Sequence, residues 1–584
     1  MRYGPSRLQR LLRLNPQICQ WRTISSLRIL APQATYLEPS HSPKRWSSNA
    51  SNPANGGSVP AIQPPEAKTA ASPTLPSRKW STPLAKTIAQ AIEVTGPVSI
   101  ASYMRQCLTN PDGGYYTTTR EGSDPFGTTG DFITSPEISQ IFGELVGIWF
   151  MTEWMAQGRP AQGVQFIEMG PGRGTLMSDI LRTVGQFSTF ARSISAVWLV
   201  EAGEGLRTKQ KDLLCGTDAE MKEVKDHTSK NVWWEATSMQ GIPVRWVEDV
   251  VLLPNQQGEA GEAGEQKEMP FIIAHEFFDA LPIHAFESVA PKPEDAQKED
   301  ARTKLLNEAG QPVPRPSMAS RLPQWRELLV APTKQKFSLP SPTEAAAKES
   351  DEKEPDPDFQ LTLAQASTPS SLVIPERPRY RTLKNQPSSR VEVSPESSRY
   401  VQDFARRIGG GIVPAPPKGR AHQPDAGVAH SESKPSGAAL IIDYGTLETV
   451  PVNSLRAIRK HKIISPFVYA GEADISADVD FSALADAALE ASPGVEVHGP
   501  IEQGAWLSQL GIKERAERLL REFQNKGGAD PEEIEKKRSE LETGWKRLVE
   551  GGPKGMGKAY KVMTILPENG GRRRPVGFGG GVVG

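Results

Sequence analysis

Apolar residues in this 584-residue chain form short continuous runs that alternate with amphipathic stretches. Buried strands are predicted for GVQFIEMG, AVWLVEAG, IPVRWVEDV, PFIIAHEFFDALP and GAALIIDYG, because a parallel strand covered on both faces reads as a nearly continuous apolar run. Between them, TLMSDILRTV and GLRTKQKDLL repeat apolar residues at helical spacing. Strands that alternate with helices in this way predict an α/β fold built on a parallel sheet.

Other patterned segments flank this alternation. Helices are predicted ahead of the sheet in TPLAKTIAQAIEV, VSIASYMRQCL and PEISQIFGELVGIWFMTEWM. Near the end of the chain, GVEVHGPI and AYKVMTILP are expected to complete the sheet as an antiparallel edge. WRELLVA and FQLTLAQ predict a hairpin-like pair of strands, and DPEEIEKKRSELETGWKRLVE predicts a charged helix facing solvent.

Composition predicts one large globular domain interrupted by polar segments. The chain holds 51 Gly and 51 Pro, which exceeds average usage. We expect the domain to span residues 80–567, preceded by a disordered linker rich in Ser, Pro and Ala at 47–79 and followed by a flexible tail at 568–584. Disordered insertions are predicted near 255–269, 288–320, 332–357 and 411–437.

The N-terminal segment differs in charge from the rest of the chain. Its first fifty residues contain seven Arg and one Lys but a single acid, Glu38, which is typical of a mitochondrial transit peptide over 1–46 and implies the matrix. A basic disordered tail is the alternative. The net charge of the whole chain is −1, so the remainder is acidic and disfavours nucleic-acid binding. No stretch of about twenty uncharged apolar residues predicts a membrane span.

A glycine-rich turn follows the first predicted strand of the sheet. The segment EMGPGRGTL places Gly170, Gly172 and Gly174 in the spacing G-x-G-x-G. The dinucleotide fingerprint requires G-x-G-x-x-G, and a P-loop requires G-K-[ST], so neither pattern is present. Glycine in such a turn allows positive φ and a close approach of backbone to a ligand. A purely structural β–α turn remains the alternative.

Two acids beside this turn indicate the chemistry of the ligand. Glu168 immediately precedes the turn, where it would repel a pyrophosphate but suit an ammonium or sulfonium group. Glu201 ends the second strand, where a carboxylate can accept hydrogen bonds from both ribose hydroxyls. A nucleoside joined to a cationic amino-acid portion describes S-adenosylmethionine, which we therefore predict as the cofactor.

The motifs resemble those of a known family. EMGPGRGTL and VEAG are similar to motifs I and II of class I S-adenosylmethionine-dependent methyltransferases. Together with GDFITSPEISQIFGELVG, AHEFFDALPIHAF, VEVSPES, LIIDYG, LRAIRKHK, GEADISADVDF and MGKAYKVMTI, they resemble the MidA-like family over roughly 85–566. The resemblance implies a Rossmann-like α/β sheet with an N-terminal helical part and long insertions.

The same resemblance implies a biological role. Mitochondrial members of the family are protein arginine methyltransferases that assist assembly of respiratory complex I. The expected product is symmetric dimethylarginine, and the expected substrate is a core matrix-arm subunit near the quinone site of complex I. These expectations come from the resemblance and not from residue spacing.

Acids in HEFFDALPIH are the first candidates for catalysis. A zinc site fails here because position 279 is Asp and the segment before it predicts a strand, whereas an H-E-x-x-H zinc site needs a helix. The MidA-like family usually has Asn where this chain has His275. Two carboxylates can orient a guanidinium by accepting its N–H groups, so Glu276 and Asp279 are predicted to be catalytic, with Asp443 next. Capping of the following turn is the alternative.

Acids in two further motifs have open roles. In GDFITSPE, we predict that Asp131, Thr134 and Glu137 line the cofactor or substrate cleft, although T-S-P-E also fits a capping box at a helix start. In GEADISADVD, Asp474 and Asp478 fit either the site or the start of a helix.

Two other functions stay open at this point. The protein could be an assembly scaffold that binds S-adenosylmethionine with little catalysis, although the intact glycine turn and the acids disfavour this. It could also be a dinucleotide oxidoreductase, which the G-x-G-x-G spacing and Glu168 disfavour.

Overall fold

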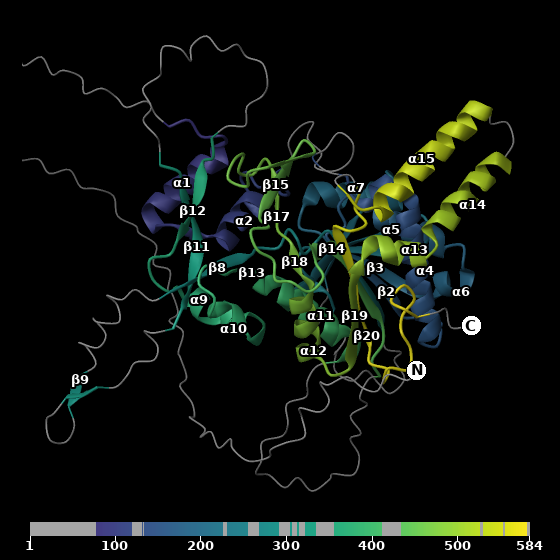
Figure 1. Ribbon diagram of the computed structural model, residues 1–584. Coiled ribbons are helices and arrows are strands. Elements are labelled where there is room, and N and C mark those ends of the chain that lie inside the picture. The colour runs from purple at the N-terminus through teal and green to yellow at the C-terminus, as the bar shows by residue number, and fades with distance from the viewer. Residues whose placement is uncertain are drawn as a thin grey trace, which may run out of the picture. The chain divides into compact units, whose positions relative to one another are not determined.

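The computed structural model describes residues 78–118, 131, 133–225, 231–254, 268–290, 304–306, 312–314, 322–334, 356–410, 434–525, 530–552 and 555–580 (Figure 1). The predicted transit peptide, almost all of the predicted linker and most of the four predicted insertions lie outside these residues. Their boundaries therefore stay predictions. Within the described residues, no helix is long and apolar enough to cross a membrane.

The helices are α1 (Pro83–Thr95), α2 (Ile100–Thr109), α3 (Ser135–Ile138), α4 (Gln140–Ala156), α5 (Thr175–Val184), α6 (Ser188–Ser193), α7 (Glu204–Cys215), α9 (Pro369–Val373), α10 (Pro378–Lys384), α11 (Pro395–Gly409), α12 (Phe481–Ala491), α13 (Gln503–Gln509), α14 (Ile512–Asn525) and α15 (Pro531–Val549). The strands are β1 (Val98–Ser99), β2 (Val164–Met169), β3 (Ile194–Val200), β4 (Lys222–Lys225), β5 (Val232–Thr237), β6 (Pro243–Val247), β7 (Met269–His275), β8 (His284–Val289), β9 (Lys304–Leu306), β10 (Pro312–Pro314), β11 (Gln324–Pro332), β12 (Phe359–Leu363), β13 (Arg390–Val393), β14 (Ala438–Thr446), β15 (Arg456–Arg459), β16 (Lys462–Ile464), β17 (Asp474–Ser476), β18 (Val479–Asp480), β19 (Val495–Glu502) and β20 (Tyr560–Pro567).

A ten-stranded sheet forms the centre of the described chain. Nine of its strands run in the order β19-β20-β14-β7-β2-β3-β6-β5-β4, and β18 pairs with β14. The pairs β14–β7, β7–β2, β2–β3 and β3–β6 are parallel, so all five predicted core strands lie side by side with their carboxyl ends at one edge. Ligands of open parallel sheets bind at that edge.

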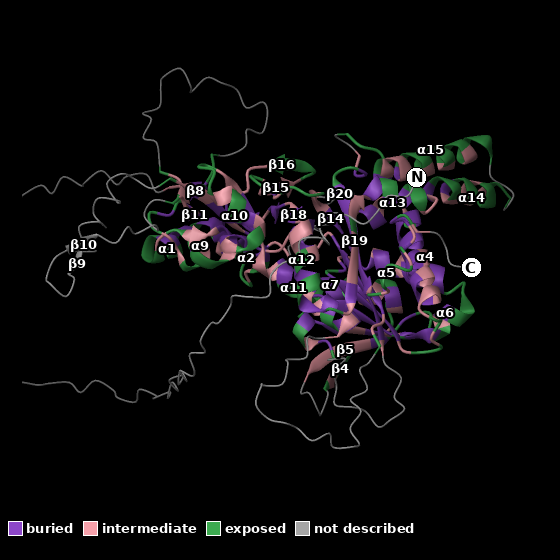
Figure 2. Ribbon diagram, turned by 60° about the horizontal axis from the view of Figure 1, so that its bottom comes forward, coloured by how far each residue is buried: buried purple, intermediate pink, exposed green. Residues whose placement is uncertain are grey.

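Each face of the sheet has its own apolar core. In β2, Phe166 packs in the core with α4 and α5, whereas the next residue, Ile167, packs in the core with α11 and α12. Successive side chains of a strand point to opposite faces, so one continuous apolar run supplies both cores. Figure 2 shows the inner strands of this sheet as mostly buried, whereas β4, β5 and β19 are largely half-buried or exposed. The layers are therefore helix, sheet and helix, as the alternating pattern predicted.

A further core joins the helices ahead of the sheet to smaller sheets. Strands β1, β11, β8 and β13 form an antiparallel sheet in that order, and β12 pairs with β11, which confirms the predicted hairpin-like pair of strands. Side chains from α1, α2, β11 and β17 meet in one apolar cluster that includes Ile88, Tyr103, Val330 and Ile475. This cluster brings segments almost 400 positions apart in sequence into one unit.

The C-terminal strands complete one end of the central sheet in antiparallel pairing, as the sequence predicted. Both are antiparallel neighbours within the central sheet, but β20 lies between β14 and β19, so that β19 alone forms the edge. The physical reason is burial, because seven of the eight residues of β20 are buried whereas β19 is mostly half-buried. An almost fully buried run fits the interior of a sheet better than its edge.

Residues 568–580 pack against the domain, whereas the sequence predicted a flexible tail. Arg573 donates to the fully buried Glu153 of α4 through its two terminal nitrogens, Nη1 and Nη2. The bond from Nη1 to Oε1 measures 2.9 Å. The indole nitrogen of Trp149 donates to the carbonyl of Val576 at 3.0 Å, and Phe578 joins the core beneath α4. Glu153 and Trp149 lie more than 400 positions before their partners in this segment, so its local composition carried no sign of them.

Replacement of Arg573 by alanine is expected to destabilise the fold. It would leave Glu153 buried without its ion-pair partner, which costs about 3 kcal/mol in free energy of unfolding. The check is chemical denaturation beside Arg572→Ala, which removes an exposed arginine from the same segment. Equal stability of the two variants would show that the ion pair does not hold this segment.

Candidate active site

The glycine turn after β2 has a backbone that requires glycine. Gly170, Gly172 and Gly174 have φ values of +59°, +55° and +84°, which residues with a Cβ atom rarely adopt. The amide of Gly170 donates to the carbonyl of Val200 at 3.1 Å, which ties the turn to β3. A Cβ on Gly170 would lie 3.1 Å from the ring of Phe277, so the loop after β7 lies directly over the turn.

A buried glutamine connects the glycine turn to the end of β3. Gln210 of α7 donates through Nε2 to the carbonyl of Gly172 at 2.7 Å and to Glu201 Oε2 at 3.3 Å. Its own oxygen accepts from the indole nitrogen of Trp246 at 3.0 Å. Gln210 lies outside the motifs predicted from the sequence. A signal was present, because Gln210 is a polar residue that is fully buried on the inner face of an amphipathic helix.

The two acids beside the turn are buried, and the structure fits a ligand with a cation and hydroxyl groups. Oε2 of Glu168 has no hydrogen-bond partner among the described residues, and burial raises the pKa of Glu168 to about 8. Glu201 accepts from the amide of Gly203 at 2.8 Å, and burial raises the pKa of Glu201 to about 7 against the effect of that amide. A buried carboxylate without a partner favours a ligand that carries positive charge. This arrangement fits S-adenosylmethionine.

The motif ahead of the sheet contacts the glycine turn. Glu137 Oε1 lies 3.5 Å from Nη1 of Arg173, which stands between Gly172 and Gly174. The backbone N–H of Thr134 donates to Glu137 Oε2 at 3.3 Å at the start of α3, so the predicted capping contact also forms. Both readings of T-S-P-E are therefore compatible with the structure.

Asp131 lies on the other side of this motif from the glycine turn. Its Oδ2 accepts from the hydroxyl of Tyr115 at 2.8 Å, and its Oδ1 accepts from the amide of Lys460 at 2.7 Å. Asp131 also raises the pKa of Asp474 through its charge. These contacts place Asp131 beside the acids described below rather than against the glycine turn.

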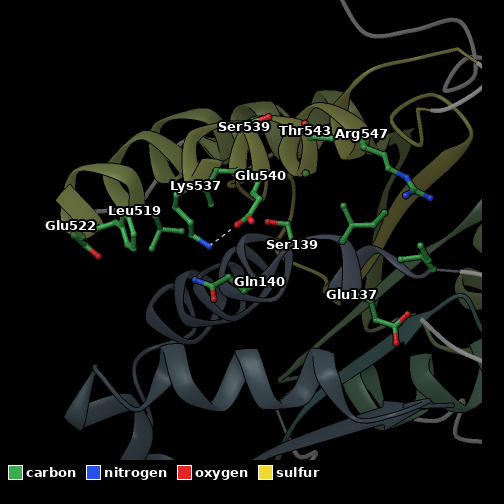
Figure 3. Close-up of a pocket in the computed structure, with 15 residues that line it drawn as sticks. Glu137, Ser139, Gln140, Leu519, Glu522, Lys537, Ser539, Glu540, Thr543 and Arg547 are labelled. Atoms are coloured by element: carbon green, nitrogen blue, oxygen red, sulfur yellow. Dashed lines mark hydrogen bonds and ion pairs between the residues drawn. The ribbon is translucent and has the colours of Figure 1, made fainter. Parts of the chain in front are cut away.

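A pocket of about 800 Å³ lies between the start of α4 and the hairpin of α14 and α15 (Figure 3). Leu519, Phe523 and Leu541 line it from the hairpin, and Ile138 lines it from the opposite side. Glu137, which pairs with Arg173, lines it as well. The pocket is thus linked to the glycine turn only through the pair of Glu137 and Arg173, and neither the turn glycines nor the acids of the loop after β7 are among its lining residues.

The loop after β7 carries an acid in an unusual backbone conformation. Glu276 has a φ of +50°, which is uncommon for a residue with a side chain. Residues in such rare backbone conformations cluster at functional sites. Oε1 of Glu276 accepts from the hydroxyl of Tyr560 at 2.8 Å. Burial and then the nearby Asp279 raise the pKa of Glu276 to about 8.

Asp443 holds this loop instead of facing a substrate. Its Oδ2 accepts from the amides of Phe277, Phe278 and Asp279 at 3.1, 2.7 and 3.3 Å, and its Oδ1 accepts from the amide of Tyr444 at 2.8 Å. The carboxylate is fully buried and these four amides occupy it. The prediction of a catalytic Asp443 is therefore corrected to a positioning role.

Two further acids and one arginine surround Asp279. Arg456 Nη1 lies 2.6 Å from Asp478 Oδ1. Burial raises the pKa of Asp279 to about 6, and the charge of Arg456 opposes this increase. Asp474 accepts from the hydroxyl of Tyr116 at 2.8 Å. Neither Asp474 nor Asp478 starts a helix. Asp480 takes that role, because its Oδ1 accepts from the amide of Ala483 at the start of α12.

His275 ends β7 in a strand, as the sequence predicted, and not in a helix. Its Nε2 has no hydrogen-bond partner among the described residues and lies 3.5 Å from Glu276 Oε1. Burial lowers the pKa of His275 to about 3, so the ring is neutral. In the described part of the chain, no group of three or more His, Cys, Asp or Glu residues could hold a metal ion.

The fold and this site together define a class of protein. A parallel sheet with a glycine turn after one strand and an acid at the end of its neighbour is the fold of class I methyltransferases. Residues 145–501 match the profile of a family of S-adenosyl-L-methionine-dependent methyltransferases. The chain belongs to this family, which confirms the predicted resemblance, fold and cofactor.

Two relatives of named function match most of the chain. A protein of Drosophila melanogaster is 31% identical over 509 residues, which cover 87% of this chain and 90% of the relative. A human protein is 30% identical over 494 residues, which cover 84% and 85% respectively. Both are named as mitochondrial protein arginine methyltransferases.

A solved structure shares the fold. It is a protein from Burkholderia thailandensis bound to S-adenosyl-homocysteine. The TM-score is 0.50 and the sequence identity is 18%. The match covers 85% of this chain and 93% of that one. At this identity it supports the α/β methyltransferase fold alone.

Replacement of Gly172 by valine is expected to abolish binding of S-adenosylmethionine. Valine disfavours the left-handed backbone at this position and places a branched side chain in the turn. Calorimetric titration checks this beside Gly241→Val, because Gly241 also has a positive φ, of +80°, but lies in open space. Full affinity in a folded Gly172→Val protein would contradict our assignment of this turn.

The affinity for S-adenosylmethionine should rise with pH between about 6 and 8. Glu168 and Glu201, with pKa values of about 8 and 7, are largely protonated at the lower end, and a cationic ligand favours their ionised forms. Titrations across this range should show proton release on binding, and Glu168→Gln should flatten the profile. Titration of the ligand itself affects the parent and the variant equally, so the difference between their profiles of affinity against pH reports on Glu168. Identical profiles would contradict the role of Glu168.

Proposed function

We propose that this protein transfers methyl groups from S-adenosylmethionine to arginine side chains of a protein substrate in mitochondria. The observation that carries the proposal is the buried acid loop after β7, whose Phe277 lies against Gly170 of the glycine turn. The names of the relatives support the same reaction and the same compartment. The arginine-rich N-terminal segment is in agreement with them.

The glycine turn and its two acids would hold the cofactor. Gly170, Gly172 and Gly174 allow the backbone to approach the ligand closely. Glu201 is available to the ribose hydroxyls, and the unpartnered Oε2 of Glu168 compensates positive charge. Thr134 and Glu137 support this turn through Arg173, which is a less direct role than the sequence suggested.

The acid loop would bind and orient the guanidinium of the substrate. S-adenosylmethionine supplies a methyl group on a sulfonium, and in transfer the S–C electron pair stays on sulfur as the new N–C bond forms. A guanidinium is fully protonated in water, so the accepting nitrogen must lose a proton. Glu276, with a pKa of about 8, is suited to receive it, and Asp279 adds negative charge beside it.

Two finer features of the proposal rest on the family resemblance. The product would be symmetric dimethylarginine, and the substrate would be a core matrix-arm subunit of complex I near its quinone site. The reaction would then take place in the matrix. Mass spectrometry of the product separates symmetric from asymmetric dimethylation because the two isomers lose different neutral amines on fragmentation.

Replacement of Glu276 by glutamine is expected to reduce methyl transfer at least about 100-fold, the scale for loss of a proton acceptor. Affinity for S-adenosylmethionine should not change. The assay incubates the full chain with recombinant core matrix-arm subunits of complex I and quantifies methylated arginine by mass spectrometry.

The matched control is Glu490→Gln, which removes an exposed carboxylate from α12. Transfer by Glu276→Gln equal to that of the control would remove Glu276 from the mechanism. A parent protein that binds S-adenosylmethionine but methylates no arginine would instead favour the scaffold function.

A further inference from the structure

We propose that Asp474 is a second substrate-binding carboxylate, which together with Glu276 binds the guanidinium and makes the site selective for arginine over lysine. This inference deepens the proposed function and depends on it. It adds a residue from β17, about 200 positions after the acid loop.

The charges around the acid loop distinguish its members. Arg456 pairs with Asp478 at 2.6 Å, and its charge is also the largest effect that lowers the pKa of Asp279. Asp478 therefore holds this arginine in an ion pair. By contrast, Glu276 and Asp474 each accept a hydrogen bond from a neutral tyrosine hydroxyl.

These two carboxylates have matching surroundings. Asp474 is 7% exposed and accepts from Tyr116, and the side chain of Glu276 is 12% exposed and accepts from Tyr560, each at 2.8 Å. The segment that follows Asp474 contacts the acid loop directly, because the amide of Ala477 donates to the carbonyl of Asp279 at 2.9 Å. A carboxylate can accept about four hydrogen bonds, so each retains capacity for the N–H groups of a ligand.

A separate observation points to a polar ligand at this place. The Nε2 atom of His275 is buried, 3.5 Å from Glu276 Oε1, and without a hydrogen-bond partner among the described residues. The hydroxyl of Ser135, whose backbone is among the groups that influence the pKa of Glu276, is likewise buried and unpartnered within the described chain. Buried polar atoms normally have partners, so a ligand with several N–H groups would satisfy groups that the protein itself does not.

The same acids lie beside the cofactor turn. A Cβ on Gly203, whose amide donates to Glu201, would lie 3.3 Å from the carbonyl of Tyr116, and the hydroxyl of Tyr116 donates to Asp474. Tyr116 therefore connects the end of β3 to Asp474, as Phe277 connects the glycine turn to Glu276. A guanidinium bound by both acids would have the cofactor as its neighbour.

This arrangement explains selectivity by geometry. A guanidinium presents five N–H donors in a fixed plane, whereas an ammonium presents three around one point. Two carboxylates and a neutral imidazole offer acceptors to several separate N–H groups at once. Lysine would leave part of this set unsatisfied, and unpaired buried acceptors are costly.

The test compares Asp474→Asn with Glu472→Gln in the same methylation assay of complex I matrix-arm subunits. Glu472 belongs to the same segment and forms a half-exposed ion pair with Arg459 at 3.4 Å, so its replacement should leave transfer within about twofold. Asp474→Asn should lower kcat/KM about 100-fold, mainly through a higher KM for the protein substrate, because one acceptor of a buried charged contact is lost. The dissociation constant for S-adenosylmethionine should stay unchanged, which a merely structural defect would not allow.

A second variant guards against failure to fold. Tyr116→Phe removes one hydroxyl and should lower kcat/KM about tenfold, the scale of one hydrogen bond to a charged group. Transfer at the wild-type rate by Asp474→Asn would overturn this inference. If that variant does not fold, transfer at the wild-type rate by Tyr116→Phe would overturn it. In either case, loss of activity in Glu276→Gln would leave the proposed function standing. A wild-type protein that methylates lysine as fast as arginine would also overturn it, whereas no transfer by the wild type would refute the proposed function itself.

Discussion

The site depends on carboxylates that are buried at the carboxyl edge of the parallel sheet with little positive charge to balance them. Glu168, Glu276 and Asp474 all have pKa values raised to about 7 or 8 by burial. Keeping an uncompensated carboxylate out of water is unfavourable, so the folded protein holds this cost in the absence of ligands. A sulfonium or a guanidinium relieves it, which gives cationic ligands an advantage over neutral molecules of the same shape.

Such acids are useful only if the backbone fixes their positions. Three glycines with positive φ shape the turn below the cofactor, and Gln210 ties that turn to Glu201. On the opposite side, Asp443 gathers three successive amides and so holds the loop that carries Glu276 in its left-handed conformation. The two halves meet where Phe277 covers Gly170. Rigid placement of this kind is what methyl transfer requires, since the reaction depends on alignment of donor and acceptor.

The remaining parts of the chain serve this arrangement from a distance. The helices ahead of the sheet pack with β17, which carries Asp474, and the last strand supplies Tyr560 to Glu276. The C-terminal segment is fixed by the buried pair of Arg573 and Glu153. Residues near 116, 276, 474 and 560 thus meet at one edge of the sheet. The protein would lose the site if any of these elements moved, even though the glycine turn itself is local.

The sequence by itself determined the local features: the buried strands, the helix–sheet–helix layers, the glycine turn, Glu168, Glu201 and the acid loop. Each of these appears as a period, a turn or a motif within about ten residues, and short-range sterics and burial dictate such patterns. Only the tertiary structure decided that Asp443 supports the loop, that Gln210 and Tyr560 join the site, that β20 lies inside the sheet and that residues 568–580 are packed. Those outcomes rest on contacts between residues dozens to hundreds of positions apart. No local pattern specifies such partners, because they come together only when the sheet and its cores have formed.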